Sequence, residues 1–298
     1  MDRVKSRGLY RRKKILPYLF ISPFFIFYGL FGLFPLIYGM VFSMWRKAKF
    51  NGLGNYVRIL TDERFWKSME NAFVYMLGSN FIIIPIACIA GLFLFSDRLE
   101  KGRGFISTLF FIPSVTSVIV AGLVFKFLLK TDHGVFNVIL QGLRLIKEPI
   151  QFLVDPAWGI PSLLLICIWR YFGVNSIYFL AGLQGVPREL REAARIDGAS
   201  GATEFFRVTL PLLKPILSFI VFQSVVGSFS MFGEIYTLQG QGGTGANDSM
   251  LFPVIFLYNK MFVDNQMNQA AAMGYILAIF LLALTLAQRR IFREVADA

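Results

Sequence analysis

The chain has 298 residues, of which 56% are hydrophobic and 16% are charged, and it contains 33 Phe. A soluble domain usually carries about 25% charged residues, and phenylalanine is stable in hydrocarbon but unfavourable in water. This composition excludes a soluble globular protein and indicates a polytopic membrane protein. The net charge of +12 does not indicate a nucleic-acid partner, because the basic residues cluster at the ends of apolar runs.

Six long apolar runs follow one another along the chain. A helix needs about 20 apolar residues to cross about 30 Å of hydrocarbon, and backbone groups in lipid must pair within their own segment. We therefore predict an all-α integral membrane fold with six transmembrane helices in one domain, residues 1–298. The runs cover about 16–44, 71–96, 104–126, 160–183, 215–238 and 269–288.

The N-terminal segment sets the predicted orientation. Met1–Lys14 holds seven basic residues, and Lys and Arg are enriched on the cytoplasmic side of membrane proteins. With the N-terminus inside, the inner segments hold eighteen basic residues and the outer segments ten. Arg46, Lys47 and Lys49 oppose this assignment, but the first cluster outweighs them. We predict a multi-pass protein in a bacterial inner membrane, surrounded by lipid, with both termini cytoplasmic.

The sequence argues against a cleaved signal peptide, disulfide bonds, a His/Cys metal site and a P-loop. The first run is too long for a signal-peptide core, so we expect it to be retained as a helix. Cys88 and Cys167 lie inside apolar runs and His133 is the only histidine, which argues against a disulfide framework or a His/Cys metal site. The Gly-rich stretch 239–247 lacks the lysine of a P-loop, so we expect ATP to be bound by another chain.

A short apolar stretch follows the Gly-rich segment. Met250–Val263 is too short to cross a membrane and contains Lys260. We predict a short helix that lies outside the membrane or at its surface.

The segment 185–215, between the fourth and fifth runs, is predicted to form two short helices joined by a sharp turn. Pro187 is suited to the start of a helix, and Gly198 can adopt the left-handed conformation that ends one. Ser200 or Thr203 can cap the second helix. Prolines at 211 and 215 are expected to interrupt this helix before the chain enters the membrane.

The first of these helices has two faces with different chemistry. An apolar patch comprises Leu190, Ala193, Ala194 and Ile196, and a charged face comprises Arg188, Arg191, Glu192 and Arg195. Such a helix can rest on lipid headgroups or dock on another protein. The residues alone leave the two interpretations about equal, although the small alanines favour close approach to a protein surface.

The same segment resembles the EAA loop of binding-protein-dependent ABC importers. The family pattern is Glu-Ala-Ala, three residues, Gly, nine residues and Ile-x-Leu-Pro. Here Glu192-Ala193-Ala194 is followed at the family spacing by Gly198 and by Val208-Thr209-Leu210-Pro211, with Val in place of Ile. The resemblance implies that the loop is a coupling helix that docks on an ATPase. The implied coupling residues are Arg188, Arg191, Glu192, Ala193, Ala194, Arg195, Asp197 and Gly198.

The resemblance extends over nearly the whole chain to the carbohydrate-importing subclass. Similar segments are Phe50–Tyr56, Phe110–Pro113 and Gln269–Ala272, and the chain as a whole is similar to permease subunits of alginate importers. The implied partners are a second, related permease of different sequence, a pair of ATPase subunits that hold ATP and Mg, and a periplasmic solute-binding protein. An acidic oligosaccharide or polysaccharide such as alginate is the implied cargo, and another sugar or a sugar phosphate is the alternative.

Polar residues inside the fourth and fifth runs are candidates for a translocation pathway, because such residues usually face a cavity or another helix. Gln223, Gly227, Ser230 and Glu234 follow helical spacing and are predicted to share one face of a helix. The predicted pathway residues are Arg170, Asn175, Tyr178, Gln223, Ser230, Glu234 and Tyr236; helix packing is the alternative role for each aromatic and small residue among them.

Arg170 leaves two interpretations open. A charge in the middle of a membrane helix needs a partner or water. One possibility is an ion pair with Glu234, and the other is a bidentate contact with the carboxylate of an acidic sugar.

Two other function classes lack support in the sequence. An ion-coupled secondary transporter is expected to show internal repeats and acidic residues near the middle of the membrane, but we find no clear repeat, and Glu234 is the only acidic residue within a run. A membrane-embedded enzyme would need a motif such as HExxH or GxSxG, and none occurs.

Overall fold

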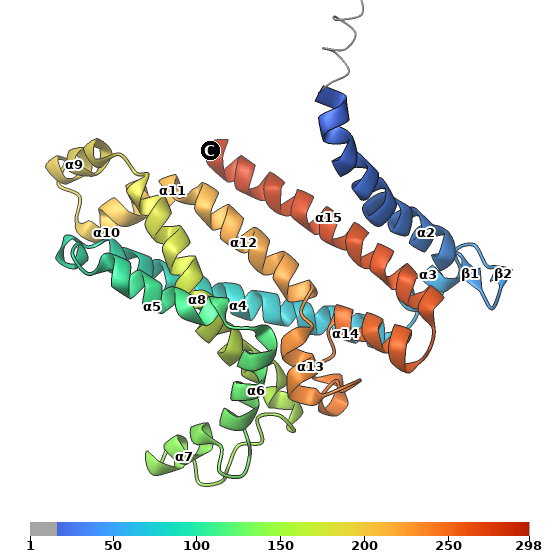
Figure 1. The fold of residues 1–298 in the computed structure, drawn as a ribbon. Coiled ribbons are helices and arrows are strands. Elements are labelled where there is room, and N and C mark those ends of the chain that lie inside the picture. Colours follow the sequence, from blue (N-terminus) through green and yellow to red (C-terminus); the bar gives the residue numbers. More distant parts are fainter. Residues whose placement is uncertain (1–16, 298) are drawn as a thin grey trace, which may run out of the picture.

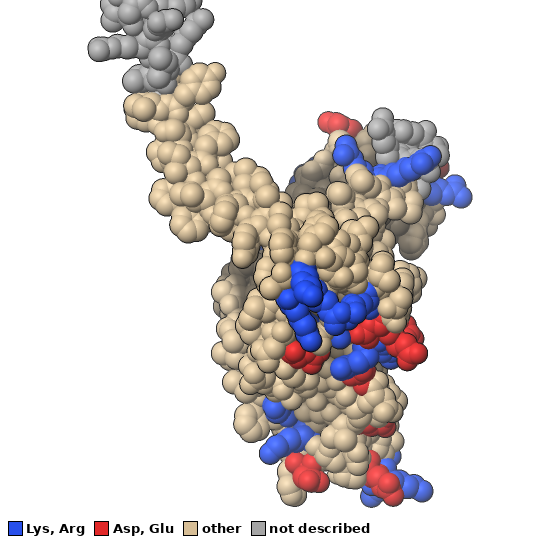
Figure 2. Space-filling view, turned by 90° about the vertical axis from the view of Figure 1, so that its right-hand side faces the viewer, with Lys and Arg blue, Asp and Glu red and all other residues tan. Residues whose placement is uncertain are grey.

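The computed structural model describes residues 17–297, with side chains as far as Phe292. The basic cluster Met1–Lys14 and residue 16, the predicted start of the first membrane helix, lie outside the described residues. A helix over Pro17–Ser43 comes first; it contains a π-helical turn, η1 (Gly29–Leu33), and ends in α2 (Phe34–Ser43). Its surface is apolar, exposed and free of charge (Figure 2), so it needs a cover of lipid or protein.

A hairpin and a short helix follow α2. Strand β1 (Trp45–Arg46) pairs antiparallel with β2 (Lys49–Phe50), and positive φ angles at residues 47 and 48 allow the tight turn between them. Helix α3 (Gly54–Leu60) is fixed to the end of α2 by Asn55. The Nδ2 of Asn55 donates to the carbonyls of Ser43 at 2.7 Å and Trp45 at 2.9 Å.

Three further single helices are long and apolar enough to cross a membrane. They are α4 (Glu63–Phe95), α8 (Gly159–Gln184) and α15 (Met267–Asp297). Helix α4 begins eight residues before the predicted run. Its first two turns carry charged residues, so they lie outside the apolar run. The α4–α8 pair is the most extensive helix contact in the described chain.

The third predicted span is a bent pair of helices. Helix α5 (Arg103–Val115) and helix α6 (Val118–Leu128) meet at 89°. Pro113, in the last turn of α5, removes a helical hydrogen bond just before the bend. Helix α5 packs tightly on α8 at Gly173, where a Cβ atom would lie only 1.8 Å from the carbonyl oxygen of Phe110.

The fifth predicted span is also interrupted. It consists of α12 (Lys214–Phe229) and α13 (Gly233–Gln239), and Phe232 between them is non-helical. The prediction of one continuous helix over 215–238 is therefore wrong. The helical spacing of Gly227, Ser230 and Glu234 fits a continuous helix, so periodicity does not indicate the break. The described residues contain four single candidate spans, or up to six if two bent pairs each count as one span; these pairs are α5 with α6, and the segment Gly201–Leu212 with α12, which meet at 68°.

Short elements connect the long helices. They are η2 (Asp97–Leu99), α7 (Val135–Gly142), η3 (Pro156–Trp158), α9 (Arg188–Ile196), α10 (Gly201–Glu204), η4 (Phe205–Thr209), α11 (Leu210–Leu212), η5 (Ala246–Asp248), α14 (Pro253–Tyr258) and η6 (Asn259–Val263).

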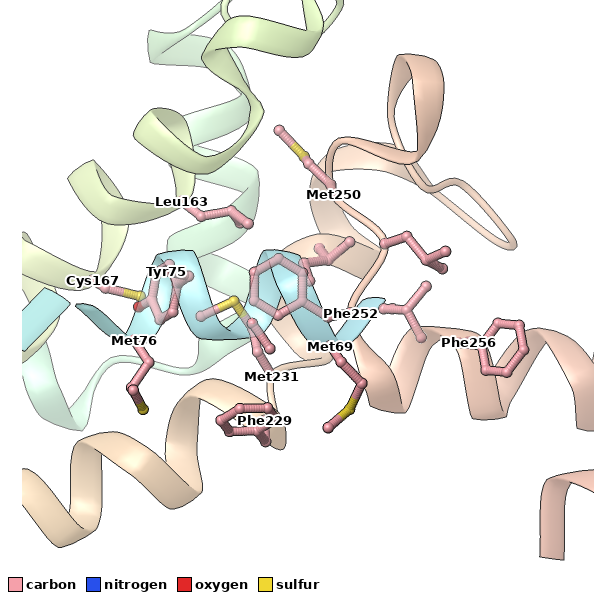
Figure 3. Packing of buried hydrophobic residues seen from close by; sticks show 14 of the residues in the cluster. Met69, Tyr75, Met76, Leu163, Cys167, Phe229, Met231, Met250, Phe252 and Phe256 are labelled. Atoms are coloured by element: carbon pink, nitrogen blue, oxygen red, sulfur yellow. The ribbon is translucent and has the colours of Figure 1, made fainter. Parts of the chain in front are cut away.

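The largest core lies between α4, α8, the α12–α13 break and α14. The rings of Tyr75 and Phe252 meet edge-on there, with their centres 5.7 Å apart, and Figure 3 shows Met231 and Phe229 in the same core. Phe252 and Phe256 are buried, and α14 packs on α4 and α15. The short helix predicted at 250–263 therefore exists, as α14 continued by η6, and the aromatic residues on its inner side pack between the long helices. Its place outside the membrane or at the membrane surface stays a prediction.

The loop that contains α9 lies at one end of the long helices (Figure 1). The C-terminal end of α15 points to the same end, whereas the hairpin lies at the other (Figure 1). Helix α12 runs from the loop toward the centre of the molecule, where it lines a cavity.

Candidate functional site

A cavity of about 670 Å³ opens between α4, α5, α8 and the α12–α13 break. Residues of α12 that line it, including Gln223 and Gly227, are exposed in this chain, so the cavity is open to its surroundings. Five of the seven predicted pathway residues line it, namely Asn175, Tyr178, Gln223, Ser230 and Glu234.

The cavity residues of the fifth span do not share one helix face. Gln223 and Gly227 lie on α12, Ser230 lies in the break and Glu234 lies on α13. The prediction that all four share one face is wrong, because the helix ends at Phe229. They nevertheless line the same cavity.

The two remaining predicted residues do not line the cavity. Tyr236 packs instead against aromatic neighbours: its ring stacks on Phe232 at 5.3 Å and meets Tyr258 edge-on at 5.8 Å. This is the packing role that the sequence left open for it. Arg170 lies behind the wall and is 5% exposed.

Arg170 forms a buried ion pair with Glu234. Its Nη1 donates to Oε1 of Glu234 at 2.9 Å and to the hydroxyl of Tyr171 at 3.2 Å. Its Nη2 donates to the carbonyl of Thr116 at 3.3 Å, at the bend between α5 and α6. Of the two interpretations of Arg170, the structure therefore shows the intramolecular pair, which joins α8, α13 and the α5–α6 bend.

Sequence reasoning missed the contribution of α4 to the cavity. Ser79, Asn80 and Tyr75 line it, and the hydroxyl oxygens of Ser79 and Ser224 lie 3.2 Å apart across the α4–α12 contact. The signal was the Ser79-Asn80 pair in an otherwise apolar run, because adjacent polar residues inside a span usually face an interior.

The local structure of the 185–215 loop agrees closely with the sequence prediction. Pro187 is the N-cap of α9, and Gly198 ends the turn after α9 with φ +84°. Ser200 caps α10, where its Oγ accepts the N–H of Thr203 at 3.3 Å. The chain then continues through η4 and α11 into α12, which begins next to Pro215.

A buried carboxylate holds the two short helices together. Glu204, on α10, is 4% exposed. Its Oε1 accepts a hydrogen bond from Nε of Arg191, and its Oε2 accepts one from Nε of Arg195, each at 2.7 Å. The guanidinium of Arg191 also lies 5.1 Å from the centre of the Phe95 ring, at the end of α4. Burial alone would raise the pKa of Glu204, but the hydrogen bonds from the two arginines outweigh it and hold this pKa below its usual value. We call this set of three residues, Arg191, Arg195 and Glu204, the loop clamp.

The outer surface of α9 stays free of contacts that would bury it. Glu192, Ala193 and Asp197 are exposed, and Ile196 is 85% exposed. Leu190 is 47% exposed on the same helix, so α9 presents apolar side chains beside its charged ones. Among the described residues, no three His, Cys, Asp or Glu side chains come together to hold a metal ion.

Comparisons with known proteins agree on the family. Residues 73–296 match the model of the binding-protein-dependent transport system inner membrane component. The arabinooligosaccharides transport system permease protein AraP of Bacillus subtilis (strain 168) is 35% identical, covering 94% of this chain and 89% of that protein. The sn-glycerol-3-phosphate transport system permease protein UgpA of Agrobacterium fabrum (strain C58 / ATCC 33970) is 30% identical, covering 93% and 94%.

The fold also matches a solved structure. A chain in the crystal structure of a bacterial ABC transporter involved in the import of the acidic polysaccharide alginate aligns with a TM-score of 0.83. The alignment covers 97% of this chain and 99% of that one at 22% sequence identity, and at this identity the match shows a shared fold.

Proposed function

Because the chain belongs to the family of binding-protein-dependent transport system inner membrane components, we propose that it is the permease subunit of an ATP-driven carbohydrate importer and that α9 docks on the ATPase. Its family and its apolar helices make it an integral inner-membrane transport component. The observation that carries the proposal is the continuity of the chain from the exposed surface of α9, through the loop clamp, into α12 and the cavity wall.

The proposed coupling surface consists of residues on α9 and in the turn after it. It comprises Arg188, Arg191, Glu192, Ala193, Ala194, Arg195, Asp197 and Gly198. Exposed charges on this surface can pair with the ATPase, while the two alanines permit close approach. When the ATPase subunits close, the motion of α9 passes to α10 because Glu204 links the two helices. It then reaches α12, which begins only a few residues later.

The proposed complex contains four further kinds of component. A second permease of different sequence covers the open side of the cavity, where α12 is exposed, and lipid covers the remaining apolar surface. Two ATPase subunits hold ATP and Mg at the end of the molecule where α9 lies, which is the predicted cytoplasmic side. A periplasmic solute-binding protein delivers the sugar at the opposite end, near the hairpin.

The similar proteins leave the charge of the cargo open. Their names give a neutral oligosaccharide for AraP, a phosphate ester for UgpA and an acidic polysaccharide for the solved importer. The resemblance of the sequence to alginate importers makes an acidic sugar one candidate, and a neutral oligosaccharide is the other. The chemistry of the cavity distinguishes these two candidates.

The proposal is tested by purifying the chain with its candidate ATPase and partner permease. We expect Glu192→Lys to abolish co-purification of the ATPase and sugar-stimulated ATP hydrolysis, because it reverses a charge at the centre of the docking surface. Glu100→Lys is the matched control, since Glu100 is an exposed acid outside the loop. Full retention of the ATPase by the Glu192→Lys complex would contradict docking through α9.

A further inference from the structure

The cavity wall combines uncharged polar groups with aromatic rings. Amide groups come from Asn80, Asn175 and Gln223, and serine hydroxyls line the side formed by α12. These groups can each donate and accept hydrogen bonds, as the hydroxyls of a sugar do. Tyr178 and Phe232 add aromatic surface, which suits the apolar faces of sugar rings.

The wall offers no cation to an anionic ligand. Within the described chain, no Lys, Arg or His side chain lines the cavity, and Glu234 is the one ionisable carboxylic acid that does. Its charge is balanced by Arg170 behind it, at 2.9 Å. The pair is therefore neutral as a unit, and the part of it that faces the cavity is the carboxylate.

Both terminal nitrogens of the Arg170 guanidinium already donate to neighbours in the protein, while its Nε is buried without a hydrogen-bond partner. Nη1 is shared between Glu234 and Tyr171, Nη2 donates to Thr116, and the guanidinium carbon lies 5.1 Å from the centre of the Tyr171 ring. A sugar carboxylate could reach Arg170 only by displacing Glu234, which would leave that carboxylate buried without a partner. A sugar that enters the cavity as an anion would instead approach Glu234 and be repelled.

We propose that this cavity selects uncharged sugars and discriminates against uronates and sugar phosphates. The inference rests on the proposed function and adds the charge class of the cargo to it. A neutral oligosaccharide gains hydrogen bonds to amides and hydroxyls without disturbing the Arg170–Glu234 pair. An acidic one loses the hydration of its carboxylate without gaining a cation, and a buried charge without a partner is strongly unfavourable.

A matched pair of ligands tests the proposal on the assembled complex of both permeases and the ATPase. The probes are labelled β-1,4-mannotriose and trimannuronate, which differ only in the carboxylates, and equilibrium binding is measured without the solute-binding protein so that its own selectivity does not enter. We expect mannotriose to bind at least about tenfold more tightly, since one unpaired charge is worth at least one tenfold step in affinity. Equal or tighter binding of trimannuronate overturns the proposal, and so does the absence of binding by either sugar.

A variant in the cavity wall provides the second arm. Gln223→Lys adds a cation at an exposed position on the wall, so it should shift the acid-to-neutral binding ratio toward trimannuronate by about tenfold. Gln223→Met is the control of similar length without the charge, and it should leave the ratio unchanged. An unchanged ratio in the Lys variant would show that charge selection occurs elsewhere. The proposed function is tested separately by sugar-stimulated ATP hydrolysis with the solute-binding protein present, so the two proposals can fail independently.

Discussion

The cavity wall and the coupling loop each contain a buried carboxylate paired with arginine, but the two sites differ in their surroundings. Glu234 and Arg170 are both almost fully buried, with side-chain exposures of 8% and 6%, and they join helices far apart in the sequence. Glu204 is equally buried, whereas its partner Arg195 is 60% exposed. The first pair is buried at the cavity wall, whereas the second has one arginine largely exposed to solvent.

This difference in exposure predicts a difference in role. Removing one partner of a buried ion pair typically destabilises a protein by about 3–5 kcal/mol, because the other charge stays buried. An exposed arginine that loses its partner is solvated by water, so the loss is smaller. The cavity pair is therefore suited to hold the bundle in one arrangement, and the loop clamp is suited to transmit force between two short helices.

The largest expected effect is from breaking the cavity pair. Arg170→Ala leaves Glu234 buried without its partner and frees the carbonyl of Thr116, so we expect a loss of stability of about 3–5 kcal/mol. The measurement is the thermal unfolding temperature and the yield of the purified complex. The double variant Arg170→Met with Glu234→Leu removes both charges and should recover most of the stability. A stable Arg170→Ala complex that loses only the transport of an acidic sugar would instead make Arg170 a ligand for the cargo.

A smaller and different effect is expected from the loop clamp. Glu204→Ala removes the two hydrogen bonds of the loop clamp, but both arginine side chains keep access to solvent, so water offsets most of the loss. We expect the bundle to unfold at an unchanged temperature while the sugar transported per ATP hydrolysed falls severalfold, because α9 can then move without α10. Glu189→Ala, which removes an exposed acid of α9, is the control.

The result for Glu204 separates force transmission from simple folding of the loop. If Glu204→Gln keeps the shape but loses the coupling ratio as Glu204→Ala does, the charge of the clamp carries the motion. If both variants keep the ratio of the unaltered complex, the clamp has no role in coupling and the comparison between the two carboxylates fails.

The sequence predicted the loop better than the cavity, for a physical reason. The loop is built from local signals: a proline before α9, Gly198 at φ +84° and the capping hydroxyl of Ser200. Each of these acts within a few residues. The partner of Arg191 and Arg195 is Glu204, on the next helix, and no spacing rule indicates which acid an arginine will reach after a turn.

The cavity depends on contacts between distant segments. Arg170 and Glu234 could be named as a pair because opposite charges in hydrocarbon need one another. The break after Phe229 is missed because the spacing of Gly227, Ser230 and Glu234 fits a continuous helix equally well. It moved Glu234 to a separate helix and left Tyr236 among aromatic neighbours outside the cavity wall.

The smallest expected effect comes from the turn next to the clamp. Gly198 has φ +84° and an added Cβ would meet no atom within 4 Å, so Gly198→Ala is penalised by backbone conformation alone, by about 1 kcal/mol. That corresponds to about a fivefold shift in the population of the correctly bent loop. We therefore expect a lower transport-to-hydrolysis ratio that is milder than for Glu204→Ala, measured in the same vesicles.

Gly201 provides the control for this substitution, because it also has open space around it but no positive φ. Gly201→Ala should leave the ratio unchanged. Gly198→Pro should act more strongly than Gly198→Ala, since it fixes φ near −65° and removes the N–H that donates to the carbonyl of Arg195 at 3.1 Å. If Gly198→Ala instead uncouples transport as fully as Glu204→Ala does, the angle of the turn governs coupling more than the clamp. The backbone of the turn, and not the ion pairs of the loop clamp, would then be the part of the loop that transmits motion to α12.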